Sequence, residues 1–409
     1  MFTVFRPLAF LPMSAAVPQG STPRHDPAPT EVRTPGHPAG GTEVYFTTNP
    51  GLEDVATDEF RRRARTAFLP VVHTQPRPLK LAGHVLVQVA APWRDVEPLV
   101  WQMRSIYHVL RPVHGFRLDA GRELDQIQAC LRHLSVPDME TAASFRVTTR
   151  RIGRHDFTSI DVQRIAGAAL VERYGRPVDL TNFAVNVRVD VFEHFCMISL
   201  QVTRANLGKR PPRPYRPRAA LKPPVAYAML QFAGLLHGGG ALLDPFCGSG
   251  TILTEAAAVN PELQLFGSDL FTEALDGVRA NLAQLELAHK IDIRQADARA
   301  LTQHFPASCF RAIVTNPPYG VILGQHLDFR RFYYRFLVQA GKVLVQDGML
   351  VLLCWKTGEL GRALRDHRGF RQLHVRVVET GGLYPRIFVL QRGSAQAAID
   401  LTPNPEENS

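Results

Sequence analysis

Short apolar runs alternate with amphipathic stretches of helical length from Val225 onward. The run A-L-L-D-P-F at 241–246 is too short for a helix and predicts a buried strand, whereas residues 251–259 predict the helix that follows it. The same alternation predicts strands at 264–268, 291–295, 311–315 and 348–355, a helix at 272–285, and an antiparallel pair of strands at 373–378 and 387–390. Alternating strands and helices are typical of a parallel sheet covered by helices on both faces. We therefore expect an α/β domain over residues 223–400.

The first half of the chain predicts two smaller α+β units. The first spans residues 43–112, with strands at 44–48 and 85–89 and amphipathic helices at 52–65 and 95–109. The second spans residues 113–207, with strands at 145–149, 186–190 and 196–203 and a helix at 160–171. A basic, proline-rich linker over residues 208–222 leads into the α/β domain, and residues 401–409 are expected to be a disordered tail.

Residues 1–42 carry frequent prolines and almost no periodicity, which predicts a disordered leader or a misassigned start. A signal peptide is the rival interpretation, but its apolar run is short and broken by Pro7, Pro12 and Pro18. No other run approaches the roughly twenty apolar residues that a membrane span needs. The five cysteines are scattered, without a disulfide framework or a C-x-x-C pair, so we expect a reducing, cytoplasmic setting.

The stretch D-P-F-C-G-S-G-T, from Asp244 to Thr251, joins the first strand of the α/β domain to its helix. Gly248 and Gly250 suit such a turn, because the chain must adopt unusual φ/ψ angles there and let a ligand approach bare backbone. The helix that begins at Thr251 points its free N–H groups at whatever occupies the turn. The spacing fits neither G-x-G-x-x-G nor G-x-x-x-x-G-K-[ST], which argues against nicotinamide dinucleotides and nucleoside triphosphates. A small polar ligand of another kind is expected.

Polar residues also follow the next strands of the α/β domain. Asp269 and Asp297 each close a predicted strand, and the tetrapeptide N-P-P-Y at 316–319 follows the strand at 311–315. Open α/β sheets keep their active sites at the carboxyl ends of the strands, so these residues should lie near the glycine turn. A single strand-end Asp is more often a cap or a turn residue. Three such residues, Asp244, Asp269 and Asp297, close strands of one predicted sheet on the side of the glycine turn, which favours ligand contacts.

The pair D-P-F-C-G-S-G-T and N-P-P-Y resembles the amino-methyltransferases that use S-adenosylmethionine. This resemblance implies a Rossmann-like class I methyltransferase sheet, with Asp269 accepting both ribose hydroxyls of the cofactor and Asp297 beside the adenine. The segment R-A-A-L-K at 218–222 resembles the one that closes over the methionine end of the cofactor. The cofactor-binding residues implied in this way are Lys222, Asp244, Phe246, Cys247, Gly248, Gly250, Thr251, Asp269, Leu270, Asp297, Ala298 and Asn316.

The same resemblance places catalysis at Asn316, Pro317, Pro318 and Tyr319. An exocyclic amine on a base is a weak nucleophile, because its lone pair is drawn into the ring. The Asn316 side-chain oxygen and the Pro317 carbonyl can accept both amine hydrogens and aim the nitrogen, and Tyr319 can stack on the base for about 1–3 kcal/mol. Cys247 is a candidate nucleophile toward a pyrimidine ring, but its place in the glycine turn puts it beside the cofactor. Scattered histidines show no metal-ligand spacing, so no metal is expected.

Basic residues gather in the second unit and in the linker, and the chain carries a formal charge of +10, which suits a polyanionic partner. The blocks F-R-V-T-T-R-R-I-G-R-H-D-F-T-S, V-N-V-R-V-D-V and I-S-L-Q-V-T-R-A-N-L-G-K-R resemble the THUMP domain, an RNA-binding module that a ferredoxin-like unit usually precedes. That likeness implies a grip on the acceptor end of tRNA. Arginines at a turn are also often only a solvated face, and a basic linker either follows a phosphate backbone or merely connects domains. The predicted RNA-binding residues are Arg150, Arg151, Arg154, Arg204, Lys209 and Arg210.

Two blocks near the end of the chain, N-P-P-Y-G-V-I-L-G and E-T-G-G-L-Y-P-R-I-F-V-L, resemble the tRNA guanine-N2 methyltransferases that act at position 6 of the acceptor stem. The hypothesis is therefore direct methyl transfer from S-adenosylmethionine to the N2 amine of a guanine in tRNA, by a monomer without metal or membrane. Methylation of a guanine in ribosomal RNA is an open alternative. The enzymes that methylate adenine in DNA or glutamine in proteins share the N-P-P-Y motif, but the THUMP-like region argues against both of these substrates. An RNA-binding adaptor with an inactive catalytic fold is the alternative of another class.

Overall fold

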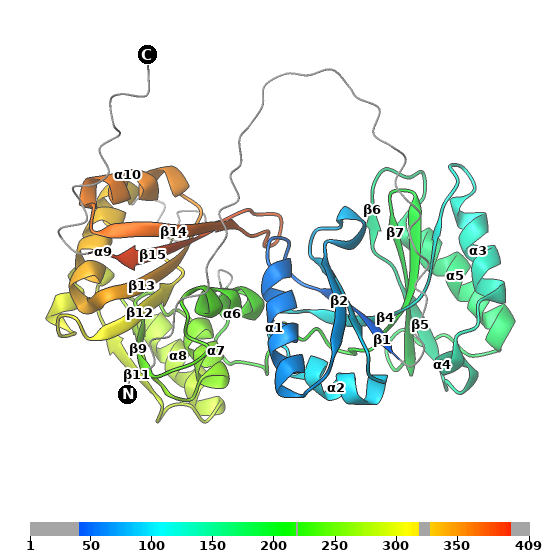
Figure 1. Ribbon diagram of the computed structural model, residues 1–409, viewed down its shortest axis with the longest axis horizontal. Helices are drawn as coiled ribbons and strands as arrows, with labels where there is room; N and C mark the ends of the chain where they lie inside the picture. Colours follow the sequence, from blue (N-terminus) through cyan, green and yellow to red (C-terminus); the bar gives the residue numbers. More distant parts are fainter. Residues whose placement is uncertain (1–40, 218–219, 319–327, 394–409) are drawn as a thin grey trace, which may run out of the picture. The chain divides into compact units, whose positions relative to one another are not determined.

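The computed structural model describes residues 41–217, 220–318 and 328–393, whose strands form two sheets (Figure 1). The predicted fold class is confirmed, because an α+β region with a largely antiparallel sheet precedes an α/β region with a largely parallel one. Residues 1–40 of the predicted leader, the predicted tail at 401–409 and Tyr319 lie outside the described residues.

The first sheet has strands in the order β2-β3-β1-β4-β8-β7-β5, with β6 paired to β7. β5 and β6 run parallel to β7, and the other neighbours are antiparallel. The boundary predicted between residues 112 and 113 falls inside β4, so the two N-terminal units share one continuous sheet. The strands are β1 (Thr42–Thr47), β2 (Val71–Pro76), β3 (His84–Val89), β4 (His108–Arg117), β5 (Phe145–Thr148), β6 (Arg151–Ile152), β7 (Val185–Phe192) and β8 (Phe195–Gln201).

Helices pack on this sheet over two larger cores, one in each predicted unit, and a smaller apolar cluster spans both units. A capping box between Thr158 and Asp161 starts α5, and Gly175 ends it in the left-handed conformation. The helix predicted at 95–109 is wrong beyond Trp101, because residues 102–107 form a loop and β4 begins at His108. The helices are α1 (Glu53–Thr66), η1 (Pro78–Lys80), α2 (Trp93–Trp101), α3 (Glu123–His133), α4 (Pro137–Glu140) and α5 (Ser159–Tyr174).

The second sheet has strands in the order β11-β10-β9-β12-β13-β15-β14. The strands from β9 to β13 run parallel, and β15 lies antiparallel between β13 and β14, which confirms both predictions for this region. The chain moves outward from β9 to β11 and returns to β12, so the direction of winding reverses between β9 and β12. Open α/β sheets bind their ligands at such a reversal. The strands are β9 (Gly240–Asp244), β10 (Leu263–Asp269), β11 (Ile291–Gln295), β12 (Phe310–Thr315), β13 (Leu344–Cys354), β14 (Phe370–Val377) and β15 (Arg386–Arg392).

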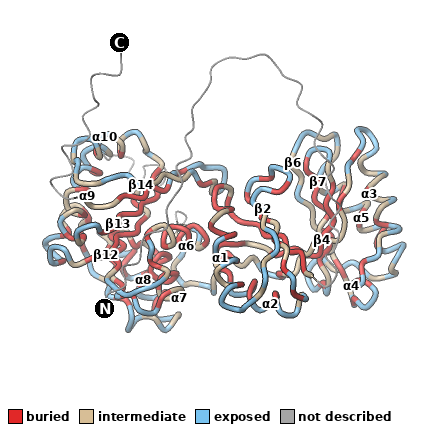
Figure 2. The backbone as a smooth tube through the Cα atoms, viewed as in Figure 1, coloured by how far each residue is buried: buried red, intermediate tan, exposed pale blue. Residues whose placement is uncertain are grey.

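Helices cover both faces of this sheet, and the buried residues of Figure 2 follow its strands. Neighbouring residues of a strand point to opposite faces: Leu242 of β9 packs in the cluster of α6, α7 and α8, whereas Leu243 packs in that of η2, α9 and α10. Leu52 and Val55 lie at the start of α1 but belong to the first of these clusters. The helices are α6 (Pro223–Phe232), α7 (Thr251–Val259), α8 (Thr272–Gln284), η2 (Ala298–Gln303), α9 (Phe329–Val343) and α10 (Thr357–His367).

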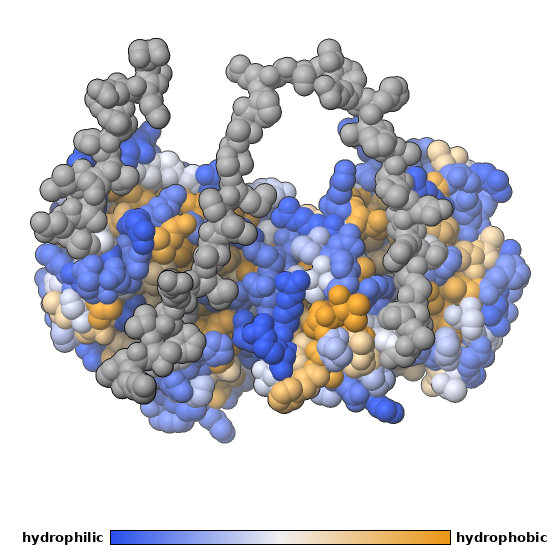
Figure 3. Space-filling model, in the orientation of Figure 1, coloured by the Kyte–Doolittle hydropathy of each residue, from blue (hydrophilic) through white to orange (hydrophobic). Residues whose placement is uncertain are grey.

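The surface in Figure 3 mixes hydrophilic residues with separate apolar patches. Among the exposed large apolar side chains are Phe68 and Val72, which lie at the end of α1 and on the edge strand β2. Across the described ranges, every helix is too short or too polar to cross a membrane.

Candidate active site at the carboxyl ends of β9, β10 and β12

The turn after β9 needs glycine at two positions for different reasons. Gly250 caps α7 with a φ of 77°, and a Cβ added there would lie 2.7 Å from a methyl carbon of Val278. Gly248 has a φ of 49°, but a Cβ added there would meet nothing within 4 Å. The turn is therefore packed against α8 at Gly250 and open at Gly248.

Side chains connect the ends of three strands around this turn. The backbone N–H of Gly248 donates to the Asp269 carboxylate at 3.0 Å, and the N–H of Phe271 donates to its other oxygen at 3.2 Å. Thr315, the last residue of β12, donates its hydroxyl to Asp244 at 2.7 Å. The predicted convergence of the strand ends of β9, β10 and β12 is thus seen in the hydrogen bonds themselves.

Asn281 of α8 holds the other side of the turn, and the sequence analysis missed it. Its buried amide donates to the Ser249 carbonyl at 3.0 Å and to the Tyr215 carbonyl at 2.8 Å, and accepts from the Tyr215 N–H at 2.9 Å. The glycine turn, α8 and the linker are therefore fastened together by one side chain. A polar residue on the apolar face of the predicted helix at 272–285 was the signal that could have found it.

Burial sets the electrostatics of Asp244 and Cys247. Asp244 is 2% exposed, and burial raises the pKa of its carboxyl to about 7 against the lowering effect of the Thr315 hydrogen bond. Burial likewise raises the pKa of the Cys247 thiol well above its ordinary value, with Asp244 and Asp269 acting in the same direction. A neutral thiol is a poor nucleophile, so the structure offers no activation of Cys247 for covalent catalysis.

Asn316, Pro317 and Pro318 directly follow β12, where the Thr315 hydroxyl reaches Asp244. Asn316 and Pro318 are half-buried and Pro317 is buried. The tetrapeptide thus begins beside the glycine turn, at the reversal between β9 and β12.

Comparisons with known proteins agree with this geometry. Residues 210–386 match the family described as RMKL-like, methyltransferase domain, and residues 121–201 match the THUMP domain. A tRNA (guanine(6)-N2)-methyltransferase of Archaeoglobus fulgidus is 30% identical, over 84% of this chain and 91% of its own length. One from Thermus thermophilus is 37% identical over 349 residues, which cover 85% of this chain and 98% of the relative. The chain belongs to this methyltransferase family. The crystal structure of TrmN from Thermus thermophilus has a TM-score of 0.72 at 34% identity, and the match covers 86% of this chain and 99% of that one.

The methyltransferases of this family depend on S-adenosylmethionine, and the residues at the strand ends fit such a cofactor. The open side of Gly248 leaves room for a ligand against bare backbone, and the first turn of α7 begins three residues further on. The Asp269 carboxylate is oriented by the hydrogen bond that it accepts from the Gly248 N–H, and it retains lone pairs that can accept from hydroxyl groups. Bound there, the cofactor supplies an electrophilic methyl group on a sulfonium ion.

The remaining predicted cofactor residues of this methyltransferase lie around the same edge. Asp297 caps η2 and pairs with Arg299 at 2.6 Å, and hydrogen bonds from Arg299 lower the pKa of its carboxyl. A carboxylate has about four lone-pair sites, so an adenine amine can still be accepted there. Phe246 points its ring at Phe332 of α9, with the centroids 5.7 Å apart, so its side chain belongs to the core. Of the others, Ala298 is buried, Leu270 is 46% exposed, and Thr251 is buried at the start of α7.

The predicted RNA-binding residues of this methyltransferase separate into exposed and paired ones. Arg150, Arg154, Arg204 and Lys209 are exposed, and Arg151 is half-buried beside His155 at 3.1 Å. Arg210 differs, because its guanidinium forms an ion pair with the buried Glu255 at 2.7 Å and its side chain is only 13% exposed.

Lys222 lies at the start of α6 and places its ammonium 6.0 Å from the centre of the Tyr107 ring. Tyr107 belongs to the N-terminal region and donates its hydroxyl to Asn49 at 2.6 Å. The described contact of Lys222 is therefore with the N-terminal region, and its predicted role at the methionine end of the cofactor stays a proposal.

Proposed function

We propose that this protein methylates the exocyclic N2 amine of guanine at position 6 of the tRNA acceptor stem, with S-adenosylmethionine as the methyl donor. The observation that carries the proposal is the constellation at the strand ends: Asp269 at the end of β10, hydrogen-bonded to the glycine turn, Asp244 bonded to Thr315, and Asn316 as the residue after Thr315. The Thermus and Archaeoglobus relatives, which bear the name of this activity, support the choice of substrate.

Each group has a task that follows from its chemistry. Asp269 accepts the vicinal ribose hydroxyls, because two oxygens on one planar group match two donors. The Asn316 side-chain oxygen and the Pro317 carbonyl accept the two hydrogens of the guanine amine, which directs the nitrogen lone pair at the methyl group. Tyr319, outside the described residues, holds the flipped base by stacking. The bond between nitrogen and the methyl carbon would form as the bond between that carbon and sulfur breaks, and the methylated amine would then release its proton to water, so no base is needed before transfer.

The proposal extends to the rest of the site and to the setting. Cofactor contacts come from the strand-end set named above, and RNA contacts from the exposed residues Arg150, Arg154, Arg204 and Lys209 together with Arg151. Domain limits follow the sequence prediction, with the first two units joined through β4. The protein acts as a monomer, and the five free cysteines support a reducing cytoplasm.

The test is transfer of labelled methyl from S-adenosylmethionine to total tRNA and to ribosomal RNA, with nucleoside mass spectrometry of both products. N2-methylguanosine is expected in tRNA, and a transcript with adenine at position 6 should not be labelled. The same nucleoside only in ribosomal RNA would overturn the substrate while keeping the chemistry. Tight tRNA binding without any methylated product would favour the adaptor alternative.

A further inference from the structure

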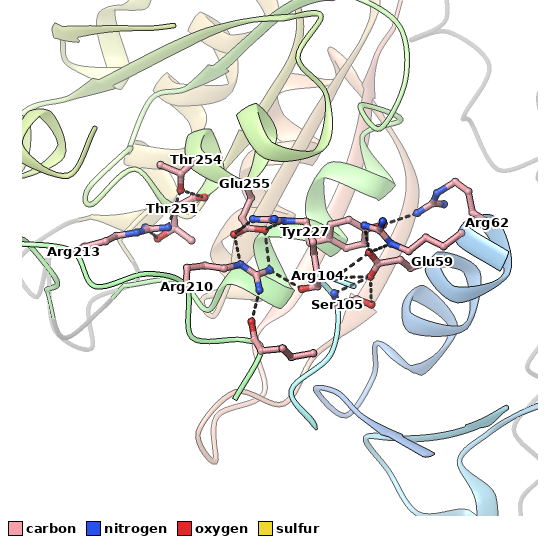
Figure 4. A network of polar contacts seen from close by, with 12 residues as sticks. Glu59, Arg62, Arg104, Ser105, Arg210, Arg213, Tyr227, Thr251, Thr254 and Glu255 are labelled. Atoms are coloured by element: carbon pink, nitrogen blue, oxygen red, sulfur yellow. Dashed lines mark hydrogen bonds and ion pairs between the residues drawn. The ribbon is translucent and has the colours of Figure 1, made fainter. Parts of the chain in front are cut away.

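Glu255 is a buried carboxylate that the chemistry of the site does not use (Figure 4). It lies on α7, one helical turn after Thr251, where the glycine turn ends. Two arginines from outside the catalytic sheet grip it. Arg104 donates through Nε and Nη2 at 2.8 and 3.0 Å, and Arg210 does the same at 2.7 and 3.0 Å. Bidentate pairs of this kind fix orientation as well as distance.

Arg104 belongs to the N-terminal region, in the loop between α2 and β4. A second buried carboxylate, Glu59 of α1, fixes this loop by accepting the N–H of Arg104 at 3.0 Å, and the N–H and hydroxyl of Ser105 at 2.9 and 2.6 Å. The loop is therefore a rigid bridge, held by Glu59 on one side and by Glu255 on the other. Arg62 of α1 adds a contact alongside, by donating to the buried Tyr227 hydroxyl of α6.

The linker enters the same cluster from a third direction. Arg210 donates to the Arg104 carbonyl at 2.9 Å, so the linker and the bridge are bonded to each other as well as to Glu255. Three residues further on, Arg213 donates to the hydroxyls of Thr251 at 3.1 Å and Thr254 at 2.8 Å, within the first turns of α7. The loop and the linker therefore meet on the helix that starts at the cofactor turn.

The two arginines keep the buried Glu255 carboxylate ionised. Burial alone would raise the pKa of Glu255, but the hydrogen bonds from Arg210 and Arg104 outweigh it and hold the pKa below its ordinary value. The two arginines face one carboxylate, so removal of Arg104 leaves a balanced pair, whereas removal of Glu255 leaves two half-buried guanidinium groups without their counterion.

We propose that Glu255 is a positioning residue for methyl transfer, which through Arg104 and Arg210 holds the cofactor turn in register with the RNA-binding region. The proposal rests on the proposed function, because it concerns delivery of a tRNA base to the donor. A tRNA gripped by the N-terminal sheet reaches the methyl group only if the distance between grip and donor is fixed. A displacement of about 1 Å at a reacting centre costs on the order of 100-fold in rate, so the cluster should act on kcat.

Arg104→Gln is the variant of choice, since it removes the direct ion pair between the loop and α7 and leaves the Glu255–Arg210 pair intact. With tRNA, kcat should fall about 10- to 100-fold, while KM for tRNA and the Kd of S-adenosylmethionine stay within about threefold. Arg104→Lys keeps the charge but not the bidentate geometry, and should give an intermediate kcat. Glu255→Gln should lower kcat at least as far as Arg104→Gln. If Glu255→Gln fails to fold, the comparison of Arg104→Gln with Arg104→Lys tests the proposal alone.

The matched control is Asp54→Asn, because Asp54 of α1 pairs with Arg376 of β14 at 2.6 Å and so also joins the N-terminal region to the catalytic sheet, away from the cofactor turn. Its kcat should stay within twofold of the parent value. Wild-type kcat in Arg104→Gln, or an equal loss in Asp54→Asn, would overturn the positioning role. Absence of methyl transfer by the unaltered protein would instead overturn the proposed function.

Discussion

Asp244 predicts a pH dependence of cofactor binding that can be measured without any RNA. Its carboxyl is buried at the end of β9 with a pKa of about 7, so the free protein carries a proton there at pH 6. Asp244 is one of the proposed cofactor contacts, and the positive sulfonium of S-adenosylmethionine would favour its ionised carboxylate. Binding below pH 7 should therefore release a proton, and affinity should rise as the pH rises toward 7.

The size of the effect on cofactor affinity follows from the pKa of Asp244 in the free protein, which is about 7. For one group with a pKa of about 7, the ionised fraction falls about 25-fold between pH 7.5 and 5.5, and the apparent affinity should fall with it. Stability moves in the opposite direction. The carboxyl is protonated in both states well below pH 3.8, and between pH 3.8 and about 7 it is ionised in the unfolded chain but still protonated in the folded protein, so folding loses stability as pH rises. The difference from the ordinary value of 3.8 corresponds to at most about 4 kcal/mol, lost in full above pH 7.

Titration calorimetry in buffers of different ionisation enthalpy measures both the Kd and the protons released. About one proton should be released at pH 6 and few at pH 8. Asp244→Asn can still accept from Thr315, so it should fold, bind more weakly at pH 7.5 and show no proton release. Asp297→Asn is the control, because the Arg299 hydrogen bonds already lower the pKa of that carboxyl out of this range. Affinity that is constant from pH 5.5 to 7.5 in the parent protein would refute the reasoning.

Three further predictions follow from single positions. Asn316→Ala should abolish methyl transfer, with tRNA binding within about twofold in a filter assay, because its oxygen orients the amine rather than the RNA; full activity would remove its catalytic role. Gly250→Ala should weaken cofactor binding and lower the melting temperature, whereas Gly167→Ala, in the open interior of α5, should stabilise by about 0.5–1 kcal/mol. The double change Arg151→Gln and Arg154→Gln should lower the salt slope of log K for tRNA by about 2; an unchanged slope would exclude phosphate contacts there.

The catalytic sheet could be predicted in detail because its information is local. The strand ends at Asp244 and Asp269, and the start of α7 at Thr251, lie where the apolar periods and the glycines put them. The same holds for the antiparallel pair at the end of the chain, where β14 and β15 were expected from two apolar runs. Local signals are reliable where each strand is short, buried and followed at once by a turn residue.

The loop at 102–107 shows where local reasoning failed. Val96, Leu99, Val100, Met103 and Ile106 are all buried, so the apolar spacing of the predicted helix at 95–109 is genuine, yet the helix ends at Trp101. Beyond that point the backbone N–H groups of Arg104 and Ser105 bond to Glu59, which lies 45 residues earlier in the chain. A distant carboxylate that accepts these N–H groups in place of helical carbonyls cannot be recognised from the local sequence. The roles of Glu255 and Asn281 also depend on residues far away in the chain, so the local sequence does not predict them.

The role of the linker also depends on long-range contacts that its sequence does not show. Its arginines, prolines and lack of acidic residues suggested a spacer that follows a phosphate backbone, but Arg210 and Arg213 point inward to Glu255 and to the threonines of α7. A guanidinium that is satisfied inside the protein releases no counterions when RNA binds. We expect such residues to add little to tRNA affinity and to affect the reaction through geometry. The inward-pointing Arg210 and Arg213 should therefore affect kcat, and the exposed charges at Lys209 and Arg204 the salt dependence of binding.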